Sequence, residues 1–335
     1  MKTYIIAEAG VNHNGDMDTA IKMIDAVKDA GCDCIKFQTF KTEALVTKSA
    51  KKADYQVENT KNNDSQFEML KKLELGFDDF KILKDYCEHA GVDFMSTPFD
   101  NSSADLLENL QVSKYKMSSG DITNKPLLEY IAKKNKPIIL STGMCTMDEV
   151  HEAVSWIEEC GNKQITLLHC TSNYPTPYSD VNMNAMLTLR DEFPYPVGYS
   201  DHTKGIIIPV MAVAMGATVI EKHFTLDKNM EGPDHKASLE PDELREMVKS
   251  IRDIESARGD GIKKPTASEM STREVARKSI VVTRSMKAGD IISQEDLTIK
   301  RPGTGLAPKY LSELIGKTVV KDIDEEALIS LDDIK

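Results

Sequence analysis

The chain has 335 residues, 40% of them hydrophobic, and a net charge of -12. This length accommodates one large and one small domain with a core that needs no covalent cross-links. Six scattered cysteines without a CxxC pair indicate reduced thiols and a cytoplasmic protein. Interspersed acidic and basic residues argue against nucleic acid or an anionic membrane surface as a partner. No apolar run has the length of a membrane span, and the N-terminal apolar stretch is too short for a signal peptide.

Short apolar runs alternate with amphipathic helical patterns, which is typical of repeated βα units. The predicted strands are residues 4–10, 34–40, 93–99, 114–120, 137–143, 165–171, 195–201 and 218–224. One predicted helix covers residues 18–31, and another begins at Thr146, where Glu149 has capping-box spacing. Eight such units in about 250 residues predict an α/β fold of the (β/α)8 TIM-barrel type, with a doubly wound open sheet as the alternative.

The repeated βα pattern of the sequence ends before the C-terminal quarter of the chain. Residues 1–257 carry the βα pattern, and residues 258–278 are rich in Gly, Lys, Pro, Ser and Thr, which indicates a linker. Residues 279–335 contain short strand patterns punctuated by Gly and Pro. We therefore expect a small β-rich C-terminal domain after the barrel.

Polar side chains lie at the end of every predicted strand. They are Glu8, Lys36, Gln38, Thr97, Lys116, Ser119, Ser141, Thr142, His169, Ser200, Asp201, His202, Glu221 and His223. A single Ser or Thr in such a position is usually a helix cap. Because all strand ends of a barrel face the same mouth, however, polar ends on all eight strands predict one common active site.

His202 and His223 come from consecutive strands and could reach one point above the barrel. Two neutral imidazoles, completed by water and substrate oxygens, suit a catalytic divalent ion such as Mn²⁺ or Mg²⁺. The alternative is that His223 is a hydrogen-bonded histidine of the barrel mouth and that His202 caps a helix. Asp201 could be a metal ligand, a support for one, or a helix cap.

Lys36 and Lys116 lie on barrel strands and require anionic partners there. They could bind a phosphate or carboxylate, or one could form a Schiff base. Hydroxyls at Ser119, Ser141 and Ser200 are of the type that binds phosphate. Since no GxGxxG or GxxxxGK[ST] motif occurs, a small phosphorylated acid is favoured over a nucleotide.

Two further segments carry candidate ligand-binding residues. The loop after the last barrel strand contains Asp234 and His235, and it is either an ordinary loop or a substrate contact. Arg301, in the small domain, precedes a proline in a turn. It could recognise hydroxyl, carboxylate or phosphate groups, although a solvated turn is the ordinary interpretation.

The chain resembles the sialic acid synthase family, the phosphoenolpyruvate-dependent synthases of nine-carbon sugar acids. The matching segments include "AEAGVNHNGD", "IKFQTFK", "LLHCTSNYPTPY", "GYSDHT", "EKHFTLDKNMEGPDHKASLEP" and "KRPGTG". The resemblance covers nearly the whole chain. It implies a TIM barrel joined to a small antifreeze-like (SAF) domain in a domain-swapped homodimer.

The resemblance also implies the reaction. Carbon 3 of phosphoenolpyruvate attacks the open-chain aldehyde of an N-acylated mannosamine, water adds at carbon 2, and the phosphohemiketal loses phosphate by C–O cleavage. With N-acetylmannosamine the product is N-acetylneuraminate. The alternative is an N,N'-diacetyllegionaminate synthase that uses 2,4-diacetamido-2,4,6-trideoxymannose, which the segment "GPDHKASLEP" resembles especially.

Residue roles carried over by the resemblance divide the predicted site into three groups. The catalytic residues are Glu8, Lys116, His202 and His223, with His202 and His223 holding the metal. The phosphoenolpyruvate clamp comprises Lys36, Thr97, Lys116, Ser119, Ser141 and Ser200, while Gln38, Tyr174, Asp234 and Arg301 of the swapped domain contact the sugar. Two positions depart from the family pattern: Asp121 replaces a glutamate at a sugar contact, and Ser172 replaces an asparagine that donates to phosphate.

Two other classes of function compete with this one. One is a Schiff-base aldolase that uses Lys36 or Lys116. The other is a carbohydrate- or ice-binding protein with a degenerate barrel, which the intact set of catalytic residues disfavours. Strand alternation also places Lys222 on the opposite face from Glu221 and His223, so we expect Glu221 to support the site and Lys222 to pack outside the barrel.

Overall fold

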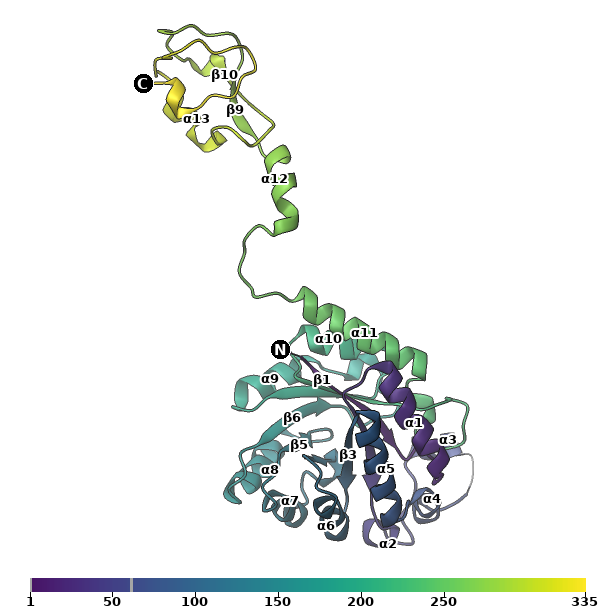
Figure 1. Cartoon of the computed structure of the whole chain (residues 1–335). Helices are drawn as coiled ribbons and strands as arrows, with labels where there is room; N and C mark the ends of the chain where they lie inside the picture. Colours follow the sequence, from purple (N-terminus) through teal and green to yellow (C-terminus); the bar gives the residue numbers. More distant parts are fainter. Residues whose placement is uncertain (1, 61–62) are drawn as a thin grey trace. The chain divides into compact units, whose positions relative to one another are not determined.

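A computed structural model describes residues 2–60 and 63–335. The chain divides into two compact units, one that extends to Gly259 and one that comprises Asp260–Lys335. Each unit has its own hydrophobic core. The first unit carries the βα pattern, and Figure 1 shows its helices arranged around the strands.

Eight parallel strands form the first unit's sheet, in the order β3-β2-β1-β8-β7-β6-β5-β4, and β3 also packs beside β4. The strands are β1 (Tyr4–Gly10), β2 (Cys34–Thr39), β3 (Asp93–Pro98), β4 (Tyr115–Met117), β5 (Ile138–Ser141), β6 (Ile165–Cys170), β7 (Val197–Asp201) and β8 (Val219–His223). The sheet therefore curves back to near closure, which confirms the predicted TIM barrel and excludes the open sheet.

The barrel unit contains helices, and several of them begin or end at a local capping signal. The helices are α1 (Met17–Ala30), α2 (Thr42–Leu45), α3 (Asp54–Thr60), α4 (Gln66–Leu73), α5 (Phe77–Ala90), α6 (Asn101–Asn109), α7 (Lys125–Ala132), α8 (Met147–Glu159), α9 (Asn184–Glu192), α10 (Ile207–Ala214) and α11 (Pro241–Ala257). The predicted capping box of Thr146 and Glu149 opens α8. Helix α1 ends at Gly31, whose φ of 78° is the left-handed conformation that glycine adopts without strain.

Strand alternation produces two apolar layers. Residues such as Ile5 and Ala7 of β1 point outward into the core between barrel and helices. The intervening positions point into the barrel, where Ile6, Cys34, Met95, Ile139, Leu168 and Val219 form one compact layer. Because the side-chain period of a strand is two residues, the next inward position on each strand lies one layer closer to the mouth. That layer is polar, and it forms the floor of the site described below.

The connection between β2 and α5 is longer than the other connections and contains α2, α3 and α4. Its two ends are joined by Glu74, which accepts hydrogen bonds from the backbone and hydroxyl of Thr42 and pairs with Lys41 at 3.1 Å. Residues 41–76 will be called the β2–α5 excursion. Its buried Met69 and Leu73 pack with Val11 and Phe40 as a small apolar cluster beside the barrel mouth.

The second unit is built mainly from loops around a short sheet. Strand β9 (Ser279–Val282) pairs antiparallel with β10 (Leu297–Lys300), and α13 (Leu311–Leu314) packs on their core. The residues predicted as a linker contain a 3-10 turn, Ala267–Glu269, followed by α12 (Met270–Ala276). Within the ranges the structure describes, no helix is long and apolar enough to cross a membrane.

Candidate active site

A cavity of about 490 Å³ lies at the carboxyl ends of the barrel strands. Each of the eight strands contributes one inward side chain to its floor, namely Glu8, Lys36, Thr97, Lys116, Ser141, Cys170, Ser200 and Glu221. The loops that follow the strands add Ser118, Ser119, Ser172, Tyr174, His202 and Asp234. The structure therefore brings most of the predicted site residues together around one space.

Lys36 connects three strands at the floor of this cavity. Its ammonium group lies 2.6 Å from Oε2 of Glu8 and 3.6 Å from Oε2 of Glu221, and it donates to Thr97 Oγ1 at 3.2 Å. The Lys36 side chain is only 4% exposed, so its charge is balanced by these carboxylates and not by water. Burial lowers the pKa of Lys36, but the charges of Glu221 and Glu8 outweigh it, so the pKa lies above its ordinary value.

Lys116 of β4 contacts the same carboxylate, Glu221, from two strands further round the barrel, and burial lowers the pKa of its ammonium group. It donates to Ser141 Oγ at 2.7 Å and lies 3.5 Å from Oε1 of Glu221. Glu221 also accepts a hydrogen bond from Ser200 at 2.9 Å. Burial favours the neutral acid, but the charges of Lys116 and Lys36 outweigh it and lower the pKa of Glu221 to about 2. Glu221 is thus an ionised carboxylate shared by both lysines.

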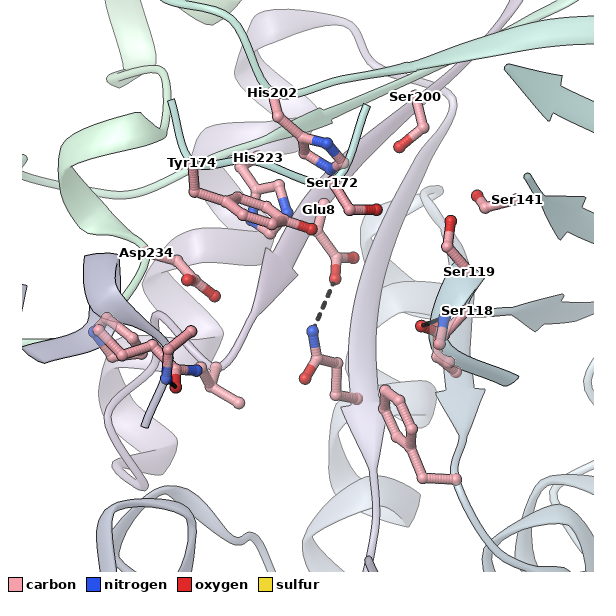
Figure 2. A pocket seen from close by; sticks show the side chains of 18 of the residues that line it. Glu8, Ser118, Ser119, Ser141, Ser172, Tyr174, Ser200, His202, His223 and Asp234 are labelled. Carbon is pink, nitrogen blue, oxygen red and sulfur yellow. Dashed lines mark hydrogen bonds between the residues drawn. The ribbon is translucent and has the colours of Figure 1, made fainter. Parts of the chain in front are cut away.

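Glu8 lies between these lysines and the histidines of the mouth. Its Oε1 accepts a hydrogen bond from Gln38 Nε2 at 3.2 Å, drawn as a dashed line in Figure 2. Burial raises the pKa of the Glu8 carboxyl, and the charge of Glu221 adds to this, although Lys36 opposes it. A buried carboxyl that is poised in this way is suited to proton transfer.

Hydroxyl groups converge around Gly143 on one side of the cavity. The Gly143 N–H donates to Ser119 Oγ at 2.9 Å. A Cβ at this position would lie 2.8 Å from Cys170 Sγ and would collide with Ser172 Oγ. Only glycine therefore permits these groups to approach one another, and the result is a surface of small donors next to Lys116. Figure 2 shows Ser119, Ser141 and Ser118 together on the side of the view opposite the histidines.

His202 and His223 form the other side, with ring centroids 5.4 Å apart. The Nδ1 atom of His202 lies 2.7 Å from the carbonyl oxygen of Thr171, so it carries the proton and leaves Nε2 as a free lone pair. The buried Nδ1 of His223 has no hydrogen-bond partner in the described part of the chain. Burial lowers the pKa of both imidazoles. Two neutral rings with available lone pairs fit a divalent ion.

No cluster of three or more His, Cys, Asp or Glu side chains within residues 2–60 and 63–335 is arranged around a metal position. An ion at the two histidines would therefore take its remaining ligands from water and substrate. Oxygen ligands of this kind suit Mn²⁺ or Mg²⁺ and leave coordination positions open for chemistry.

Tyr174 covers the histidines and links them to the β2–α5 excursion. Its ring lies 4.2 Å from that of His202 and stacks on Tyr55 of α3 at 5.0 Å. Asp234 lies near it in Figure 2. Burial, with a contribution from Glu8, raises the pKa of Asp234 to about 7, and its Oδ1 has no hydrogen-bond partner among the described residues. An unpaired, buried carboxyl of this kind is available to a ligand hydroxyl or amide.

Several of the polar residues that the sequence analysis named do not line the cavity. Asp121 is not part of its wall, because it lies in the turn after β4 and accepts a hydrogen bond from Asn124. His169 bonds to the carbonyl of Val181, and Thr142 donates to that of Leu168. His169 and Thr142 each follow an inward residue, so they lie at outward positions and bind a loop carbonyl and a strand carbonyl, respectively. Arg301 is exposed and belongs to the second unit.

The structure also adds wall residues that the sequence did not single out. Cys170 occupies the inward position of β6, which strand alternation from Leu168 could have revealed. Tyr55 comes from the β2–α5 excursion, where no local signal marks it as a site residue. The excursion further supplies an apolar wall that comprises Leu45, Val46, Ala53, Met69 and Leu70.

Comparison with known proteins agrees with this fold. The NeuB family model matches residues 23–263, and the SAF domain model matches residues 277–335. The chain is 51% identical over 330 residues to the N,N'-diacetyllegionaminic acid synthase of Campylobacter jejuni, covering 98% of this chain and 99% of that protein. It is 50% identical to the enzyme of the same name from Legionella pneumophila, covering 94% of this chain and 90% of that protein.

A solved structure supports the same grouping. The N-acetylneuraminic acid synthetase of Leptospira borgpetersenii, in complex with citrate, matches with a TM-score of 0.72 and 37% identity, covering 81% of this chain and 90% of that one. A TIM barrel with a polar mouth and a C-terminal SAF domain defines the class. The chain belongs to the NeuB family, which confirms the resemblance to sialic acid synthases.

Proposed function

We propose that this chain is a phosphoenolpyruvate-dependent nonulosonic acid synthase. The observation that carries the proposal is the division of one cavity into two chemically different sides. Lys36, Lys116 and a group of hydroxyls form a side suited to a small phosphorylated acid, while two neutral imidazoles and unpaired Asp234 form a side suited to a sugar aldehyde. Glu8 lies between them.

The lysine side supports binding of phosphoenolpyruvate. Both ammonium groups are buried and are at present balanced by Glu8 and Glu221. A ligand with phosphate and carboxylate groups would share these cations, and charge-assisted hydrogen bonds from lysines and hydroxyls would fix its orientation. Ser119, Ser141 and Ser200 lie within this group. For the proposed reaction, carbon 3 of the bound molecule must face the histidines.

Glu8 is the chain's candidate for proton transfer. As carbon 3 of phosphoenolpyruvate attacks the aldehyde, the aldehyde oxygen must gain a proton, and the water that adds at carbon 2 must lose one. The raised pKa of Glu8 suits a group that exchanges a proton with either oxygen. A divalent ion held by His202 and His223 would polarise the aldehyde carbonyl as a Lewis acid. Collapse of the phosphohemiketal then breaks the C–O bond and releases phosphate.

For the sugar we propose 2,4-diacetamido-2,4,6-trideoxymannose ahead of N-acetylmannosamine, which reverses the order expected from the sequence. The two relatives at about half identity are named for diacetyllegionaminic acid. The apolar wall of the β2–α5 excursion supports the same choice. We propose a pose with the aldehyde carbon at the histidines and the far end of the sugar toward this wall, which also carries Gln56 and Gln66. In the diacetamido sugar that end carries two methyl groups, whereas N-acetylmannosamine carries hydroxyls there.

Phosphate release with phosphoenolpyruvate and Mn²⁺ tests both levels of the proposal. We expect turnover with the diacetamido sugar, and a kcat/KM at least about tenfold above that with N-acetylmannosamine, since one or two buried methyl groups are worth about 1–3 kcal/mol. The reverse preference would make the chain an N-acetylneuraminate synthase. Phosphate release with neither sugar would contradict the proposal as a whole.

Metal removal separates this mechanism from a Schiff-base aldolase. Excess EDTA should abolish turnover, and Mn²⁺ should restore it. His223→Ala should remove the metal-dependent activity, because it deletes one of two protein ligands. Activity that persists in EDTA, together with borohydride trapping of a substrate on Lys36 or Lys116, would favour the aldolase instead.

A further inference from the structure

A buried ion pair lies on the reverse side of the two strands that carry the histidines. Lys222 Nζ lies 2.5 Å from Asp201 Oδ2, and neither side chain is exposed to solvent. Lys222 directly precedes His223, and Asp201 directly precedes His202. Since successive side chains of a strand point to opposite faces, this pair lies behind the imidazoles and outside the cavity. The expectation that Lys222 lies on the outer face is met, but it is an ion-pair partner there and not simple packing.

The pair fixes both residues that flank His202 in the chain. Asp201 precedes His202 and is a member of the pair, and Thr203 follows His202 and is hydrogen-bonded to the pair. Asp201 accepts hydrogen bonds from the backbone N–H of Thr203 at 3.2 Å and from its hydroxyl at 3.0 Å. Lys222 also donates to the carbonyl oxygen of Thr203. Residues 201 and 203 are therefore tied to the residue that precedes His223. Asp201 cannot serve the metal from this position, because both of its oxygens are engaged on the far face.

The position of His202 depends on these neighbouring contacts more than that of His223 does. The ladder between β7 and β8 ends with the pairing of Asp201 and Lys222, so His202 is the first residue beyond it. His223 is still within the sheet, where it pairs with Glu8 of β1. Without the contacts of Thr203, Asp201 and Lys222, the position of His202 would depend on its own hydrogen bonds to the loop after β6.

Stability alone does not account for a fully buried ion pair. Desolvation of two charges costs several kcal/mol each, and apolar replacement of such pairs is often neutral or stabilising. We propose that Asp201 and Lys222 are positioning residues that set the separation of His202 and His223 for a divalent ion. This inference rests on the proposed metal-dependent function. Support behind metal ligands typically changes metal affinity by about 10–100-fold.

The test measures Mn²⁺ affinity directly, by electron paramagnetic resonance of the free ion in titrations of the full-length protein. Lys222→Met alone would leave Asp201 as an unpaired buried charge, so the main variant is the charge-free double replacement Asp201→Asn with Lys222→Met. We expect its Kd for Mn²⁺ to rise at least about tenfold. Turnover should recover substantially at saturating Mn²⁺, because the imidazoles themselves are intact.

Two further variants keep the test decisive. Leu128→Ala opens a cavity under α7, where this side chain is fully buried, away from β7 and β8, and should lower the melting temperature without changing the Kd for Mn²⁺. Thr203→Val removes one hydroxyl contact to Asp201 without altering charge. It should weaken Mn²⁺ binding about threefold, a smaller loss in the same direction than that of the double replacement, and it serves in place of the double variant should that one fail to fold.

The outcomes separate this inference from the proposed function. If the wild-type protein binds Mn²⁺ and both the folded double variant and Thr203→Val bind it equally well, the positioning role is overturned while the metal site stands. If Leu128→Ala weakens Mn²⁺ binding as much as the double variant does, the effect reflects general stability and the inference also fails. If the wild-type protein binds no Mn²⁺, the metal-dependent function itself is overturned and the inference falls with it.

Discussion

The Nζ atom of Lys36 lies 2.6 Å from Oε2 of Glu8, and both side chains are at most 4% exposed. The pair stands at the boundary between the lysine side and the histidine side of the cavity. Lys36 is suited to holding an anionic substrate, and Glu8 to moving a proton where that substrate meets the aldehyde. Under the proposed function, this one contact would couple ligand binding to proton transfer.

Replacing Glu8 by glutamine should separate these two functions. Gln keeps the shape of the side chain but cannot exchange a proton, so we expect kcat to fall by about 10²-fold or more. The KM for phosphoenolpyruvate should not rise, since Lys36 loses a competing carboxylate. Steady-state kinetics measure both parameters. Asp16→Asn, an exposed helix cap that follows the same strand, is the control and should leave both unchanged. A Glu8→Gln enzyme with near-normal kcat would remove Glu8 from the chemistry.

Gly143→Ala should damage the phosphoenolpyruvate side selectively. The added methyl group would collide with Ser172 and would lie 2.8 Å from Cys170 Sγ, so the donors around it must separate. We expect the KM for phosphoenolpyruvate to rise at least about tenfold, which corresponds to about 1.4 kcal/mol. Gly120→Ala is a matched control in the same cavity wall, where a Cβ would meet only Ser118 Oγ at 3.6 Å. Equal effects of the two substitutions would contradict the crowded-donor interpretation.

Asp234 predicts a pH dependence of stability. Burial raises the pKa of its carboxyl to about 7, whereas an unfolded Asp titrates near 3.9. The folded state thus retains a proton that the unfolded state has lost, so this contribution to stability is complete below about pH 4 and disappears as the pH rises through about 7. Asp234→Asn mimics the protonated form and removes that loss.

Thermal unfolding without substrates measures this effect. We expect Asp234→Asn to match the wild type at about pH 4 or below and to exceed its melting temperature at pH 8, while its KM for the sugar increases because the charged or hydrogen-bonding carboxyl is gone. A variant that is less stable than the wild type at pH 8 would show that the carboxyl is satisfied in the folded protein.

Arg301→Ala tests whether the SAF unit takes part in catalysis. If the arginine reaches the sugar pocket of a second copy in a homodimer, its loss should raise the KM for the sugar more than that for phosphoenolpyruvate. Arginine suits this contact because its planar guanidinium can bind two acceptors at once. Lys309→Ala, in the same unit, is the control and should be silent. An Arg301→Ala enzyme with both KM values unchanged would contradict the domain-swapped arrangement.

The fold and most of the cavity floor could be predicted because they follow from short-range regularities. Alternation with a period of two assigns Glu8, Lys36 and Glu221 to the interior of the barrel once the strands are recognised. The same rule placed Lys222 on the outer face. Asp121 was assigned as a sugar contact only through the resemblance, and this role stays a prediction, since the structure shows only that its carboxylate accepts a hydrogen bond from Asn124 in the turn after β4.

The amino-acid sequence alone specified the eight strands, their inward positions and the polar ring at their ends. These features depend on the alternation of side chains along a strand, which is the same in every strand. The sequence could not specify which charges meet. Glu221 lies between Lys36 and Lys116 because curvature of the sheet brings β2, β4 and β8 around one axis. Tyr55 reaches Tyr174 because a long connection folds back over the mouth. Such contacts join residues far apart in the chain, and only the packed molecule decides them.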